Sequence, residues 1–197
     1  MKDTQVLLEE INKDIKSKLS EKRYEHSIGV MKKIGELAKK YNVDINRARL
    51  VGIAHDIAKE MSTEDKLRYV KEHNIEIDEI EQINVELLHT KIGADICKNK
   101  YGFEKKMQDA IKYHTTGNPN MDDLAKILLI ADKTENGRTY IDFAKIEKLE
   151  EKGINELLIY VLDESIKFTI DKGKIIHPDS IYTRNAFLLK CYNSQQL

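Results

Sequence analysis

The chain has 197 residues, enough for one domain with a sizeable core, and its 33 basic against 34 acidic residues give no basic excess for binding a nucleic-acid polymer or an anionic membrane. Two cysteines, Cys97 and Cys191, lie far apart without a CxxC pattern, which fits a reducing compartment better than a disulfide-linked secreted domain. Charges interrupt the N-terminal region and the longest later apolar run, 157–162, is too short to cross a bilayer, so we expect a soluble, cytoplasmic protein with no nucleic-acid or membrane partner.

Apolar residues recur at three-to-four spacing along nearly the whole chain, and only two prolines interrupt them, which predicts an all-α helical bundle. A first helix is expected over 4–19, and Ser20 is expected to cap a second helix. The stripe that this second helix buries is predicted to contain Tyr24, Ile28, Met31 and Ala38.

Cap residues predict where the later helices begin and end. Asp44 should cap a third helix that ends near His55 and Asp56, and Ser62 with Asp65 resembles a capping box for a fourth helix that ends near 73–74. Further helices are expected over 85–101 before Gly102, from 104 to about 114, over 121–135, over 154–172 and from Pro178 onward.

Histidines and aspartates recur in an ordered set along these predicted helices: His26, the pair His55-Asp56, His89, His114 and Asp132. Successive members of the set are separated by 20 residues or more, except for the adjacent pair His55-Asp56 and for Asp132, which follows His114 more closely. The side chains must therefore come from different helices that converge in space. Imidazole nitrogens and carboxylates together can hold a divalent metal ion, and such an ion can activate water near neutral pH. The set therefore predicts a metal-dependent hydrolytic site.

Asp132 follows the apolar stretch 127–131, where an unpaired carboxylate would be costly to bury. Either Lys133 or a metal ion must compensate the charge. We favour the metal, because Lys133 is the next residue along the helix and is expected to point to a different part of its surface.

The ordered set resembles that of the HD-domain metal-dependent phosphohydrolases, and the match is closer to their bacterial YqeK branch. The strings that carry this resemblance are RYEHSIGV at 23–30, HDIAKEM at 55–61, LLHTKIGA at 87–94, HTTG at 114–117, ADKTENGRTY at 131–140 and HPDSIYTRNAF at 177–187. The resemblance implies one HD domain over 1–197, with a core at about 20–140 and a C-terminal helical extension at about 141–197.

The resemblance also implies a metal site. Its ligands would be His26, His55, Asp56 and Asp132, and the ion would be iron. Manganese, cobalt or zinc also suits these ligands. A second ion at His89 and His114 stays open.

The resemblance further implies the residues that handle the nucleotide. Catalytic roles fall to Lys59, His89, His114 and Arg138. The nucleotide contacts would be Arg23, His26, Asp56, Lys59, His89, His114, Thr115, Asp132, Arg138, Lys174, Ile175, Ile176, His177 and Ile181. Read without the resemblance, His177 could equally be a residue that merely starts the last helix.

The reaction implied is the symmetrical hydrolysis of diadenosine tetraphosphate, a dinucleoside polyphosphate, to two molecules of ADP. Two alternatives remain open: another HD-domain nucleotide phosphohydrolase or phosphodiesterase, and a non-catalytic nucleotide sensor that contains a metal. An apolar C-terminal helix could also pack against a second copy in a homodimer.

Overall fold

Helices make up the regular structure of the protein. The computed structural model describes residues 3–137 and 142–194, which form eleven α-helices, one short 3-10 helix and no strand, so the all-α prediction is confirmed for this part of the chain. The N-terminal helices are α1 (Thr4–Lys18), α2 (Glu21–Lys40), α3 (Ile45–Ala54), α4 (Thr63–Glu72), α5 (Glu79–Ile83) and the 3-10 helix η1 (Val85–Leu87).

The second half of the chain contains longer helices. They are α6 (Leu88–Tyr101), α7 (Lys105–Tyr113), α8 (Asp123–Thr134), α9 (Phe143–Lys152), α10 (Ile154–Asp171) and α11 (Pro178–Ser194). Within the described residues, none of these helices combines the length and the apolar character needed to cross a bilayer.

Local capping explains where several of these helices begin and end. The predicted caps Ser20 and Asp44 accept backbone N–H groups of the first turns of α2 and α3, and Gly102 ends α6 in the left-handed conformation at φ 69°. The capping box predicted at Ser62 is only half formed, because the Asp65 side chain pairs with Arg68 instead. Ser20, Asp44 and Gly102 thus fix one end each of α2, α3 and α6, three helices that carry predicted metal or nucleotide residues.

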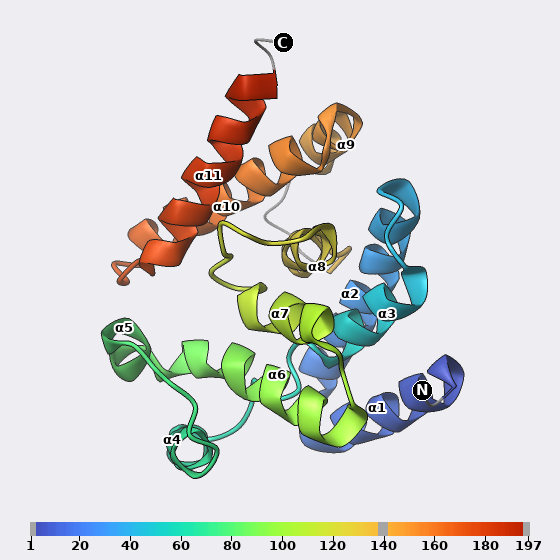
Figure 1. Ribbon diagram of the computed structural model, residues 1–197, viewed down its shortest axis with the longest axis vertical. Coiled ribbons are helices and arrows are strands. Elements are labelled where there is room, and N and C mark those ends of the chain that lie inside the picture. The colour runs from blue at the N-terminus through green and yellow to red at the C-terminus, as the bar shows by residue number, and fades with distance from the viewer. Residues whose placement is uncertain (1–2, 138–141, 195–197) are drawn as a thin grey trace.

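The helix α8 lies at the centre of the molecule, with α10 and α11 on one side and α6 and α7 on the other (Figure 1). It packs against α2, α3, α7 and α10. Its residues 127–131 are fully buried in the main hydrophobic core, which draws on helices from α1 to α11. The last turn of α8 is therefore held from several directions.

Two features of the fold differ from the predictions. The most buried apolar side chains of α2 are Val30, Ile34 and Leu37 together with Ala38, whereas Tyr24, Ile28 and Met31 are only partly buried at the border of the core. The helices α5 and α9 were not predicted, although Asp142 caps α9 in the ordinary way. The predicted stripe on α2 was thus correct in its spacing but wrong in its centre.

Candidate metal centre

Six side chains from five segments converge next to the end of α8. His26 comes from the second turn of α2, His55 from the C-cap of α3 and Asp56 from the turn that follows. The others are His89 in the first turn of α6, His114 at the C-cap of α7 and Asp132 near the end of α8. All six are buried except His26, whose side chain is 10% exposed.

Three of the four imidazoles are oriented by the same backbone device. In each of them Nδ1 donates its hydrogen to the carbonyl three residues earlier, so the neutral ring carries a lone pair on Nε2. The acceptors are Gly52 for His55 at 2.8 Å, Ile111 for His114 at 2.7 Å, and Glu86 for His89. The lone pairs of all three rings consequently face the Asp56 carboxylate.

The imidazoles and carboxylates of the four predicted metal ligands lie close to one another. His26 Nε2 lies 3.0 Å from Asp132 Oδ1 and 4.0 Å from Asp56 Oδ2. His55 Nε2 lies 3.5 Å from Asp56 Oδ2 and 3.8 Å from Asp132 Oδ1. Ligand atoms held about 2.0–2.2 Å from one ion lie about 3–4 Å from one another, and these His–Asp distances fall in that range. Two overlapping groups each have their ligand atoms within 4.8 Å of one another: His26, His55 and Asp132, and His55, Asp56 and His114.

His55 supplies a direct test of this fit. Its Nε2 is fully buried and lacks a hydrogen-bond partner among the described residues, although two carboxylates face it. Burial would lower the pKa of His55, but the charges of Asp56 and Asp132 outweigh it and raise that pKa. The same two charges that favour a proton on His55 also favour a metal cation at that place.

Both carboxylates stay ionised at neutral pH. Burial would raise the pKa of Asp56, but His55, His114 and His89 hold it well below its ordinary value. Burial acts in the same direction on Asp132, and Lys133 and His26 outweigh it, so this pKa is also well below its ordinary value. Two negative charges therefore face the imidazole lone pairs.

The second half of the cluster combines His89, His114 and Lys59. His89 Nε2 lies 3.2 Å from His114 Nε2, 3.3 Å from Asp56 Oδ1 and 3.3 Å from Lys59 Nζ, which donates to it. Burial lowers the pKa of His89 to about 4 and lowers the pKa of His114 as well. Burial also lowers the pKa of Lys59, although Asp56 and Asp132 oppose the shift.

Two basic residues complete the surroundings of the carboxylates. Arg23 Nη1 donates to Asp56 Oδ2 at 2.9 Å, so this predicted nucleotide residue reaches the cluster. Lys133 Nζ donates to Asp132 Oδ2 at 2.8 Å, and the expectation that Lys133 points elsewhere is therefore wrong. The long Lys133 side chain lets its ammonium group reach back along the helix surface, while Asp132 Oδ1 remains directed at His26.

Glu135 was missed by the sequence analysis. It directly follows α8, is 6% exposed and accepts from His26 Nδ1 through Oε1 at 3.2 Å. No sequence pattern marks its role, because Gly29 borders its carboxylate only in the folded chain.

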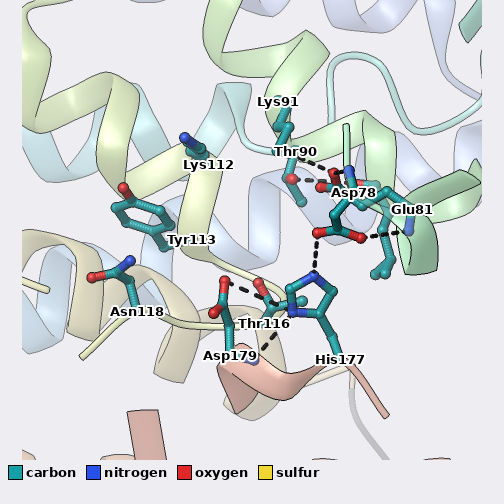
Figure 2. Close-up of a pocket in the computed structure, with 11 residues that line it drawn as sticks. Asp78, Glu81, Thr90, Lys91, Lys112, Tyr113, Thr116, Asn118, His177 and Asp179 are labelled. Carbon is teal, nitrogen blue, oxygen red and sulfur yellow. Dashed lines mark hydrogen bonds and ion pairs between the residues drawn. The ribbon is translucent and has the colours of Figure 1, made fainter. Parts of the chain in front are cut away.

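A pocket of about 150 Å³ is lined by residues of α5, α6, α7 and the start of α11 (Figure 2). Thr90 and Tyr113, the chain neighbours of His89 and His114, contribute to its wall. Across the pocket His177 Nε2 lies 2.9 Å from Asp78 Oδ2, and the Asp179 backbone N–H donates to His177 Nδ1 at 3.2 Å. The start of α11 is thereby linked to the cap of α5.

The remaining predicted nucleotide residues that the structure describes are not among the six side chains of the cluster. Thr115 is half-buried, and its neighbour Thr116 rather than Thr115 lines the pocket. Arg138 lies outside the described residues. The residues before and within α11 are half-buried or exposed: Lys174, Ile175, Ile176, His177 and Ile181.

Comparison with known proteins places the chain in a family. A sequence model of the HD domain matches residues 23–137, more than half of the chain. The chain belongs to the HD-domain family. All six residues of the cluster lie within the matched HD segment, as does Glu135.

Individual HD-domain relatives extend the match beyond that segment. The chain is 35% identical over 177 residues to a symmetrical bis(5'-nucleosyl)-tetraphosphatase from Halalkalibacterium halodurans, covering 89% of this chain and 94% of that one. It is 32% identical to the Bacillus subtilis protein of the same name, covering 87% and 92%. A crystal structure from Clostridium acetobutylicum, described as a predicted HD-superfamily hydrolase involved in NAD metabolism, matches with a TM-score of 0.87 at 36% identity, covering 92% and 97%.

Proposed function

We propose that the protein is a symmetrical bis(5'-nucleosyl)-tetraphosphatase, a metal-dependent hydrolase that cleaves diadenosine tetraphosphate into two molecules of ADP. The observation that carries this proposal is the match to two relatives of that name over almost their whole length. The buried cluster of imidazoles and carboxylates supports it, because phosphoanhydride hydrolysis calls for a cation beside ionised ligands and neutral imidazoles.

In this proposal His26, His55, Asp56 and Asp132 hold a divalent ion, which when bound polarises phosphate oxygens and makes water more acidic. Arg23 donates to the Asp56 carboxylate and Lys59 donates to His89, and both supply positive charge against the polyphosphate bridge. The Nε2 atoms of His89 and His114 carry no hydrogen in their neutral tautomers, so either ring must gain a proton before it can donate one to the leaving ADP.

Several finer points belong to the proposal. We choose iron and a single ion on the resemblance to the YqeK branch, although nitrogen and oxygen ligands also accept manganese, cobalt or zinc. The contacts of Arg138, Thr115 and the 174–181 segment with nucleotide rest on the same resemblance. So does a cytoplasmic location.

Product analysis tests the reaction. The metal-reconstituted protein is incubated with dinucleoside polyphosphates of different bridge length, and the products are separated by anion-exchange chromatography. Symmetrical cleavage of diadenosine tetraphosphate yields ADP alone. Equal amounts of ATP and AMP would contradict the proposal, and so would a preference for deoxynucleotides or cyclic dinucleotides.

A variant of Asp56 tests the role of the cluster. Asp56→Ala removes a carboxylate that faces three imidazoles, so bound metal and turnover should both be lost while circular dichroism stays that of a helical protein. Full activity of the metal-free variant would contradict the ligand assignment.

A further inference from the structure

Glu135 lies directly behind the His26 ring. Its Oε1 is 3.2 Å from His26 Nδ1, whereas Nε2, on the other side of the ring, faces Asp132 Oδ1 at 3.0 Å. A carboxylate oxygen accepts hydrogen bonds, so when an ion takes the lone pair of Nε2, Glu135 accepts the ring hydrogen that His26 then carries on Nδ1. The two ring nitrogens point in different directions. The Glu135 carboxylate therefore lies on the opposite side of the His26 ring from Asp132.

His26 needs such a partner because its own helix offers none. His55 and His114 cap helix C-termini, where backbone carbonyls are left free by the end of the helix. His26 is the sixth residue of α2, where carbonyls take part in the helical hydrogen bonds, and the Arg23 carbonyl also accepts from the Ser27 hydroxyl at 3.2 Å. The acceptor for His26 therefore has to come from another element.

Two glycines make room for the Glu135 carboxylate. A Cβ atom at Gly29, one turn after His26 on α2, would lie 2.7 Å from Glu135 Oε2. A Cβ atom at Gly137 would lie 2.9 Å from both carboxylate oxygens, and the Gly137 N–H donates to Oε2 at 2.6 Å. The carboxylate thus occupies a space that exists because both of these neighbours lack a side chain.

From this arrangement we infer that Glu135 is a positioning residue for the metal centre, which fixes the tautomer and the direction of the His26 ring so that Nε2 is presented to the ion. It does for His26 what backbone carbonyls do for the other three histidines. The inference rests on the proposed metal ligands. Loss of a partner that orients a metal-binding histidine changes metal affinity by about 10- to 100-fold.

A titration of the metal-free protein with Co²⁺ against a competing chelator, followed by the absorption of the bound ion, tests this inference. Glu135→Ala should weaken Co²⁺ binding by about 10- to 100-fold. Glu135→Gln should give an intermediate affinity, because its amide has one oxygen to serve both His26 and Gly137. Gly29→Ala should also weaken binding, since it displaces the carboxylate without removing its charge.

Matched variants separate these effects from general loss of stability. Gly35→Ala lies on the same helix, where its Cβ atom would meet only the flexible Arg49 side chain at 3.3 Å, and Glu150→Gln removes a partly buried, paired carboxylate from α9. Both should bind Co²⁺ as the unchanged protein does. A weakened affinity in both controls would overturn the inference, because the effect would then not be specific to Glu135.

Unchanged Co²⁺ affinity in Glu135→Ala overturns the inference. If that variant does not fold by circular dichroism, unchanged affinity in Gly29→Ala overturns it instead. The Asp56→Ala variant tests the ligand set separately. Wild-type Co²⁺ binding there would reject the metal ligands, whereas loss there without an effect at Glu135 would reject only the positioning role.

Discussion

Carboxylates at several depths in this protein are kept ionised by basic partners. Asp56 faces imidazoles and Asp132 faces Lys133 and His26, whereas the partly buried Glu150 accepts from the ammonium groups of Lys33 at 3.0 Å and Lys40 at 2.9 Å, joining α9 to α2. Burial would raise the pKa of Glu150, but the two lysines lower it below its ordinary value near 4.5. A carboxyl group whose pKa is lowered on folding stabilises the folded protein at pH values above the ordinary pKa of that group.

The Glu150 pairing predicts a pH-dependent stability difference. Glu150→Gln should lower the free energy of unfolding by roughly 1–2 kcal/mol at pH 7. The difference should persist down to about pH 5 and shrink as the pH falls below 4.5, because Glu150 then gains a proton first in the unfolded chain and, at lower pH, in the folded protein. Urea denaturation at pH 7 and pH 3.5 measures it. The exposed neighbour Glu151, changed to Gln, is the control, and an equal difference at both pH values would contradict the prediction.

At the scale of elements, the close contact between α2 and α3 brings His26 and His55 together. Gly52 makes this contact possible, because a Cβ atom there would lie 2.7 Å from Ile34 Cγ2 and 3.0 Å from the Met31 Cα atom. The Met31 backbone cannot move aside as a side chain tip could. The carbonyl of Gly52 also orients His55, so packing and ligand direction depend on the same residue.

Gly52→Ala should therefore force the two helices apart. Overpacking costs about 1–3 kcal/mol and exceeds the gain of about 1 kcal/mol from removing a glycine within a helix. Chemical denaturation should show a loss of stability, and Co²⁺ affinity should fall as His26 and His55 separate. Gly35→Ala, on the facing helix, should leave stability unchanged or raise it. Equal stability of the two variants would contradict this account.

Local signals made most of the helices and the cluster residues predictable. Ser20 and Asp44 mark the starts of two helices and Gly102 marks the end of a third. The ordered set of histidines and aspartates supported the resemblance to the HD-domain family, and that resemblance named the site residues. Glu135 and the reach of Lys133 were not predictable in this way. Glu135 contacts His26 across 109 residues of sequence, so its role depends on how α8 packs against α2. The contact of Lys133 with Asp132 depends on the conformation of a long, flexible side chain.

At the scale of the whole molecule, the central helix α8 joins the cluster to helices from both halves of the chain. The division into an HD core and a C-terminal extension stays a prediction. So does a homodimer. The apolar residues that α11 exposes are Ile181, Tyr182, Leu189 and Tyr192.

Metal loading should stabilise the whole fold, because the ligands converge only in the folded state. A divalent ion present at 100 times its dissociation constant adds about 2.7 kcal/mol, which corresponds to a rise in Tm of about 5–10 °C for a chain of this size. Thermal unfolding followed by circular dichroism with Co²⁺ and with a chelator measures the shift. Asp56→Ala should abolish it, and an equal shift in that variant would contradict the ligand assignment.

The separation of His26 from Asp132 by 106 residues has a consequence for biosynthesis. At about 5–20 residues per second, a ribosome needs roughly 5–20 s to travel from one codon to the other. Throughout that interval the nascent chain displays the early histidines without the carboxylate that completes the centre. The complete set of predicted ligands is thus absent until the ribosome has translated the central helix, which ends at Thr134 of the 197 residues.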